Sequence, residues 1–274
     1  MTARIDRIVV ALDAVSENRA AIDTAVRLAV RWRARLHGVF VEDDDLLRLA
    51  HLPFARQVSL GAGVERLTLQ QAERQLRAFA EHARRDVAAA ATRQNVDWSF
   101  AVVRGAAAAG IAAASATDFI VAGTATRPIG GHFRSESRWW AAVEPALASF
   151  LLASRAWDRH AAVVTLVRNR EPVAERLLDG AAQLAEAVGG QLTIICPSEL
   201  AEDEGFVGWL GERLEHYTVP VEIELAPADP TDLLQRIGEL DCRLIAIAAD
   251  DPQAAREKLR DLSTRIGCDV LVVR

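Results

Sequence analysis

Short apolar runs alternate along this chain with longer stretches in which apolar residues recur every three or four positions. Most of the runs lack interior charges, as expected of parallel strands covered by helices on both faces. The longer stretches have the spacing of amphipathic helices, as from residue 68 to residue 90. We expect strands at residues 5–12, 36–41, 98–103, 119–122, 150–153, 162–167, 192–196, 221–225, 244–248 and 269–273. The pattern predicts an α/β fold.

The order of elements repeats. It restarts near Trp157, which divides the chain into residues 1–156 and 157–274, and each part reads as five strands separated by helices. Right-handed crossovers then make each half a doubly wound, five-stranded parallel sheet. We expect two separate sheets that pack against each other as an intramolecular pseudo-dimer, so one continuous sheet would contradict this arrangement. Residues 42–63 interrupt the first half as an insertion.

The stretch DFIVAGTATRPIGGHFRSES, from Asp118 to Ser137, is the main candidate for chemistry. Its apolar run stops at Gly123, and a loop rich in Gly, Thr, Ser and Arg follows. Ligands of open α/β sheets bind at such strand ends, so this is a candidate anion-binding loop. An ordinary strand-to-helix loop is the alternative, because glycines are frequent in loops.

Composition and charge exclude several classes of function. The chain has 274 residues, 51% of them hydrophobic, and a net charge of −6, which argues against a nucleic-acid partner. No apolar run reaches the length of a membrane span and no signal-peptide core precedes the first strand, so we expect a cytoplasmic protein without a membrane partner. The three cysteines stand singly and fit a reducing compartment. No metalloprotease or hydrolase motif occurs and no general base is evident, so we assign neither catalytic nor metal-binding residues and do not expect an enzyme.

Three other groups of residues have a structural and a functional interpretation. The acidic run at residues 42–45 could bind Mg²⁺, but we favour helix capping and exposure to water. His132 could touch an anion in the loop, but a solvated histidine is the simpler interpretation. Trp139 and Trp140 could close over a ligand, whereas packing into a core or interface is more common for such a pair.

The chain resembles a tandem member of the universal stress protein family. The resemblance is carried by IVVALDAVSENRAAIDTAVRLA, by LHGVFVEDDDLLRLAHLPFARQV, by VVRGAAAAGIAAASATDFIVAGT and, in the second half, by AVVTLVRNREPVAERLLDGAAQLAEAVGGQLTIICPSE. It implies a five-stranded parallel sheet in each half and a pseudo-twofold pairing of the halves. It also implies an adenine nucleotide, ATP or ADP, whose adenine and ribose lie near Asp13 and Val41.

The family's phosphate loop has a glycine pattern that this chain matches in part. Gly123 and Ser137 fit the spacing, but Thr126 and Glu136 replace the second and third glycines. The Cβ of Thr126 obstructs backbone N–H groups, and the carboxylate of Glu136 repels phosphate, so we expect a weakened site. Three further residues of the loop could reshape it and restore affinity, namely Arg127, Gly130 and Gly131.

The second half departs further from the family pattern. Val167, Arg168 and Asn169 replace the turn that contains the aspartate, and no glycine loop follows the fourth strand. We expect Asp250 and Asp251 to cap the next helix and this half to bind no nucleotide.

Two functions follow from the resemblance. The first is a cytoplasmic stress-response or regulatory protein of bacterial type that acts by binding an unidentified protein partner, with at most a weakened nucleotide site in the first half. The alternative is a regulatory protein that binds ATP or ADP, with slow ATP hydrolysis left open. A homodimer of the tandem chain is left open too. In a competing account, Leu46, Leu47, Leu49 and Phe54 of the insertion fold into the cleft and block adenine itself.

Overall fold

The computed structural model describes residues 5–14, 18–42, 44–52, 54, 56–59, 63–105, 111, 114–115, 117–123, 139, 148–154, 162–227, 230–240, 242–254, 262 and 266–274. The first half contributes β1 (Arg7–Leu12), β2 (Arg35–Glu42), β5 (Trp98–Arg104), β6 (Asp118–Gly123) and β7 (Ser149–Ala153) to the sheet. The second half contributes β8 (Ala162–Leu166), β9 (Leu192–Cys196), β10 (Val221–Leu225), β11 (Cys242–Ala248) and β12 (Asp269–Val273). All ten strands expected from the sequence are therefore present.

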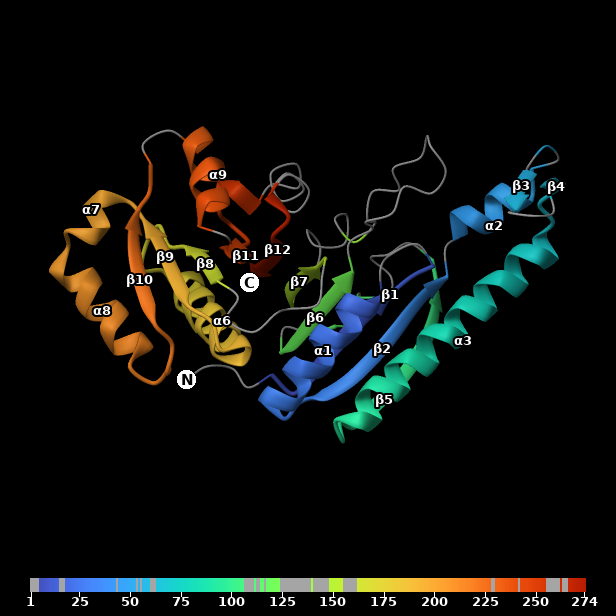
Figure 1. The fold of residues 1–274 in the computed structure, drawn as a ribbon, viewed down its shortest axis with the longest axis horizontal. Coiled ribbons are helices and arrows are strands. Elements are labelled where there is room, and N and C mark those ends of the chain that lie inside the picture. The colour runs from blue at the N-terminus through green and yellow to red at the C-terminus, as the bar shows by residue number, and fades with distance from the viewer. Residues whose placement is uncertain are drawn as a thin grey trace.

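The strands form one sheet in the order β10-β9-β8-β11-β12-β7-β6-β1-β2-β5. In Figure 1 the strands of the second half lie on the left and those of the first half on the right. Numbered within each half, both sets of strands have the same order, 3-2-1-4-5 from the outer edge inward. Every pairing inside a half is parallel. The α/β class and the five parallel strands of each half are thus confirmed.

The expectation of two separate sheets is corrected by one pairing. β7 and β12 run antiparallel, with Leu151 opposite Leu271, and this joins the halves into a ten-stranded sheet. The joining strands are apolar and buried, so an unpaired edge would expose both backbone groups and hydrophobic side chains. Asp269, at the start of β12, accepts hydrogen bonds from the backbone N–H (2.7 Å) and the hydroxyl (2.6 Å) of Ser154 at the end of β7.

Helices cover both faces. The described helices are α1 (Asn18–Trp32), α2 (Asp44–Ala50), α3 (Leu69–Arg93), α6 (Pro172–Val188), α7 (Ser198–Ala201), α8 (Glu204–Leu214), α9 (Pro230–Glu239) and the 3₁₀ turn η1 (Pro252–Ala254). On one face, side chains of α1, α3, α6 and α8 share a single hydrophobic cluster with both halves of the sheet. The cluster on the other face, which includes α9, also extends through both halves. Arg31 of α1 pairs with Glu186 of α6 across the junction at 2.5 Å.

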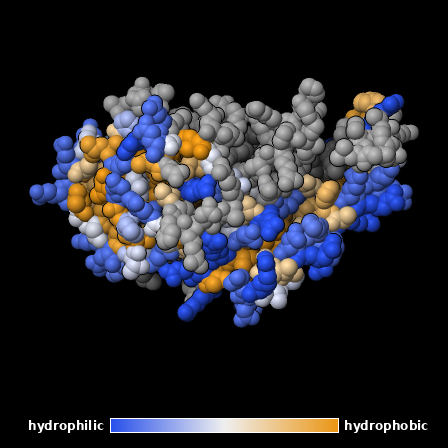
Figure 2. Space-filling model, viewed as in Figure 1, coloured by the Kyte–Doolittle hydropathy of each residue, from blue (hydrophilic) through white to orange (hydrophobic). Residues whose placement is uncertain are grey.

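Local sequence explains where these helices begin and end. Thr68 and Gln71 form a reciprocal capping box at the start of α3. Pro172 occupies the first turn of α6, and Gly189 ends it in the left-handed conformation at a φ of 64°. The outward side of α3 is mainly hydrophilic (Figure 2). No helix among the described residues is long and apolar enough to cross a membrane.

The insertion has its own small structure. After α2 it forms a two-stranded antiparallel hairpin of β3 (Arg56–Ser59) and β4 (Gly63–Arg66). Leu47 and Ala50 of α2 are buried against Leu76 of α3, whereas Phe54 is 73% exposed. Part of the insertion therefore packs on α3, beside Ala14, which follows the candidate residue Asp13.

Candidate functional site

The carboxyl ends of β1, β2 and β6 bring three predicted residues to one edge of the sheet. Asp13 directly follows β1, Val41 is the penultimate residue of β2, and Gly123 ends β6. β1 lies between the other two strands, and all three run parallel. The sequence-predicted trio is therefore placed together, at the strand ends where ligands of open α/β sheets bind.

Asp13 directly follows β1 and is hydrogen-bonded to the first residue of α1. It is 4% exposed, and its backbone N–H donates to Asn18 Oδ1 at 3.3 Å. The Asn18 side-chain amide donates in return to the carbonyl oxygen of Asp13 at 2.7 Å. Asn18 begins α1 and fixes the position of Asp13, a role that the sequence analysis missed.

Glu42 corrects one expectation. We expected it to face water with the other acids of the run at residues 42–45, but it is 9% exposed and its Oε2 accepts hydrogen bonds from Arg104 Nη2 (3.0 Å) and Nε (3.2 Å). The two residues are register partners on β2 and β5. Among the described residues, no group of three or more acidic, His or Cys side chains could hold a metal ion. Glu42 thus acts as a structural residue beside Val41.

The phosphate-loop candidates are outside the part of the chain that the structure describes. This applies to Arg127, Gly130, Gly131 and Ser137, and also to Thr126, Glu136, His132 and Trp140. Trp139 is described and is fully buried in a hydrophobic cluster, which supports the core interpretation for this residue.

The same edge of the second half has different chemistry. Arg168 follows β8 and its Nε donates to Asp251 Oδ2 at 2.6 Å, just beyond β11. A cavity of about 120 Å³ remains there, bounded by this ion pair, Asn169 and Asp250. We expected Asp250 and Asp251 to serve as helix caps. Asp251 directly precedes η1, and its carboxylate, which is 4% exposed, binds Arg168. A guanidinium and a carboxylate thus occupy the strand ends that correspond to those of Asp13 and Gly123.

Comparison with solved structures identifies the fold. A universal stress protein from Archaeoglobus fulgidus aligns over 99% of this chain and 97% of its own, at a TM-score of 0.64 and 13% identity. A putative universal stress protein from Pseudomonas aeruginosa aligns over 98% of this chain and 92% of its own, at a TM-score of 0.59 and 15% identity. The chain therefore has the universal stress protein fold in a tandem arrangement. No protein-family model matches the sequence, and no curated protein matches it either.

Proposed function

We propose that this protein is a universal stress protein-like regulatory protein of the bacterial cytoplasm that acts by binding a partner protein. In this proposal its two domains are residues 1–156 and 157–274, and only the first retains a nucleotide site, in weakened form. The observation that carries the proposal is the difference between the two halves: Asp13, Val41 and Gly123 meet at the strand ends of one half, and an ion pair lies at the corresponding ends of the other.

The chemistry of the two edges supports this asymmetry. Asp13 is held by Asn18 beside two backbone strand ends, an arrangement able to accept hydrogen bonds from a ribose or adenine. In the second half, a ligand would have to displace the hydrogen bond between Arg168 and Asp251 and fit a cavity of about 120 Å³, which is below the usual range of ligand pockets.

Calorimetric titration with ATP and ADP tests the proposal. We expect at most one nucleotide per chain, and Asp13→Ala should abolish whatever binding occurs. Asn169→Ala is the matched control at the other edge and should leave binding unchanged. Two equivalent sites per chain would contradict the proposed asymmetry. Adenine nucleotide retained through native purification would favour the alternative function, a nucleotide-responsive regulator with or without slow ATP hydrolysis.

A loop variant distinguishes the causes of weak binding. If Thr126 and Glu136 weaken phosphate binding, Thr126→Gly with Glu136→Gly should strengthen ATP binding by about 1–3 kcal/mol, because backbone N–H groups are freed and a like charge is removed. Adenosine has no phosphate, so its affinity should hardly change. If the insertion blocks the cleft instead, the loop variant should change neither affinity, whereas deletion of the insertion should strengthen both. Equal gains for ATP and adenosine in the loop variant would refute the assignment of the loop.

A further inference from the structure

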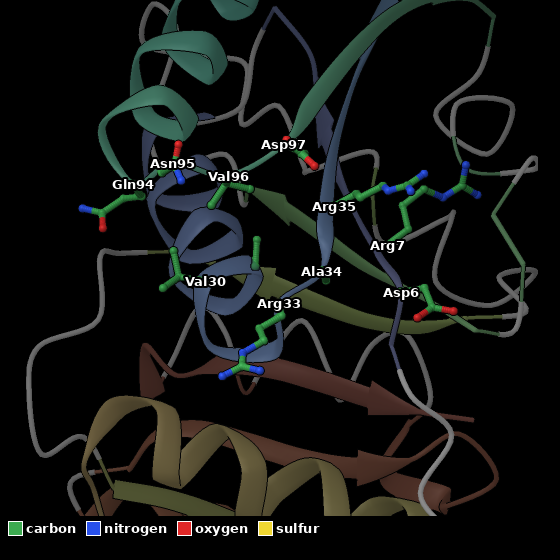
Figure 3. Close-up of a pocket in the computed structure, with 11 residues that line it drawn as sticks. Asp6, Arg7, Val30, Arg33, Ala34, Arg35, Gln94, Asn95, Val96 and Asp97 are labelled. Carbon is green, nitrogen blue, oxygen red and sulfur yellow. The ribbon is translucent and has the colours of Figure 1, made fainter.

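Two arginines lie side by side at the opposite, amino end of the first-half sheet. Arg7 on β1 and Arg35 on β2 are register partners, and their side chains extend in the same direction (Figure 3). Adjacent like charges on neighbouring strands are unfavourable unless an opposite charge compensates them. The two residues therefore call for an anion, from the protein or from a ligand.

Among the described residues, Asp118 is the carboxylate with a printed contact to this pair, while Asp6 and Asp97 lie at the same edge of the sheet. Asp118 at the start of β6 accepts from Arg7 Nε at 2.9 Å and from Arg7 Nη2 at 2.5 Å. Arg35 is exposed and has no ion-pair partner among the described residues. The segment from residue 105 to residue 117, which precedes Asp118, carries no charged side chain. One positive charge of the pair is thus not neutralised by Asp118.

A histidine and a hydroxyl adjoin the arginines on the same face. His37, two residues after Arg35 on β2, is half-buried, and its Nδ1 lies 2.8 Å from the hydroxyl of Ser99 on β5. Burial lowers the pKa of His37 first, and the charge of Arg7 lowers it further, against an opposing effect of Asp118. An anion bound beside these groups would raise the pKa of His37, because it would stabilise the imidazolium form.

The second half provides an internal comparison. Its strands have the same register, with Val163 opposite Leu192 where the first half has Ile8 opposite Leu36. The positions that correspond to Arg7, Arg35 and His37 are therefore Ala162, Gln191 and Thr193. Since the same sheet forms with neutral residues there, the fold does not require the basic cluster of the first half.

We propose that Arg7, Arg35 and His37, with Ser99, form a binding site for a phosphate group, either inorganic phosphate or a small phosphate monoester. Arginine guanidinium groups match the geometry of phosphate oxygens, and the hydroxyl and imidazole can donate further hydrogen bonds. Both arginines also line a cavity of about 820 Å³ at this edge, together with Asp6, Asp97 and residues at the ends of α1 and α3. Their side chains point away from those helix ends (Figure 3). The site is separated from Asp13 by the length of β1, about 20 Å at the usual strand rise.

Arg35→Gln tests the site without breaking the structural ion pair of Arg7. It introduces the residue that the second half has at the corresponding position, and we expect it to weaken the binding of inorganic phosphate and of glycerol 3-phosphate about tenfold, as for loss of a charged hydrogen bond. Arg33→Gln is the matched control, because Arg33 is exposed at the same edge but lies at the end of α1, on the side away from the guanidinium groups of Arg7 and Arg35 (Figure 3). This control should leave both affinities within about twofold of the original.

The measurements are calorimetry on the full chain at constant ionic strength and NMR titration of the His37 imidazole. Phosphate should raise the pKa of His37 relative to chloride, and the ligand with higher affinity identifies the form of phosphate that the site prefers. Equal weakening by Arg33→Gln and Arg35→Gln, or a His37 pKa that does not respond to phosphate, would overturn the proposal. Loss of phosphate binding in Asp13→Ala would do so too, because the anion would then lie at the nucleotide edge. We expect Arg35→Gln to leave the affinity for ATP unchanged, so a failure of this proposal can be distinguished from a failure of the proposed function.

Discussion

Arg104→Gln should destabilise the protein more than Glu42→Gln, although both substitutions break the same ion pair. The reason is the unequal burial of the partners: the Glu42 side chain is 12% exposed and that of Arg104 is 56% exposed. Loss of Arg104 leaves a carboxylate in a site largely closed to water. Loss of the Glu42 charge instead leaves a guanidinium that water can solvate.

The magnitudes follow from these two environments. Exposed ion pairs contribute about 0.2–1 kcal/mol, whereas an uncompensated buried charge costs about 3–5 kcal/mol. Because Glu42 keeps some access to water, we expect Arg104→Gln to lower the free energy of unfolding by about 2–3 kcal/mol. Glu42→Gln should lower it by less than about 1 kcal/mol. The double variant should be more stable than Arg104→Gln alone, since no buried charge remains.

Urea denaturation of the three variants at neutral pH measures these differences, with the slope of the transition as a check that the unfolded state is unchanged. Equal losses in the two single variants would refute the argument from burial. A greater loss in Glu42→Gln would show that the carboxylate contributes mainly through interactions other than the one with Arg104.

Three further predictions concern the sheet. Gly38→Ala should cost about 1–3 kcal/mol of stability because its Cβ would lie 2.6 Å from Phe100 Cδ2, whereas Gly208→Ala, in an open position of α8, should stabilise by up to about 1 kcal/mol; thermal unfolding compares them. Burial would raise the pKa of Asp118, but hydrogen bonds from Arg7 and Ser115 outweigh it and lower that pKa, so the stability from Asp118 should be complete above about pH 4 and lost below it. Asp118→Asn should flatten the acid limb of a pH–stability profile, and an unchanged limb would contradict this. Because both hydrophobic clusters span the two halves, circular dichroism and tryptophan fluorescence should report one coincident urea transition, and two separate transitions would show independent domains.

The strands could be predicted because their burial leaves a local signature. β1, β6, β9 and β11 have covered faces on both sides and read as nearly uninterrupted apolar runs. β10 alternates apolar and acidic residues instead, as suits an outer strand, and turn residues on both sides still mark it. The two halves have the same order of strands and helices, and this order predicted the duplication although the residues of the two halves differ.

Contacts between distant segments could not be predicted in the same way. Acids after a strand resemble helix caps, and only the register of β2 with β5 shows that Glu42 faces Arg104. The junction of β7 with β12 links residues more than a hundred positions apart and leaves no periodic signal. Of the candidate site, the sequence indicated Asp13, Val41 and Gly123 through strand ends and resemblance, but Asn18 acts through a local turn that looked like an ordinary helix start.

The composition of the strand edges explains why the halves join where they do. Within β7 and β12 the interior positions are apolar and uncharged. Either strand, left unpaired, would be an edge strand prone to pair with another chain. The outer strands β5 and β10 carry Arg104, Glu222 and Glu224, charges of the kind that discourage pairing with another chain. Antiparallel pairing of β7 with β12 therefore leaves neither apolar strand at an edge of the sheet, and the charged strands β5 and β10 form the two outer edges. β7 pairs with β6 and β12 pairs with β11, so the junction also places the unlike strand ends of the two halves in one sheet.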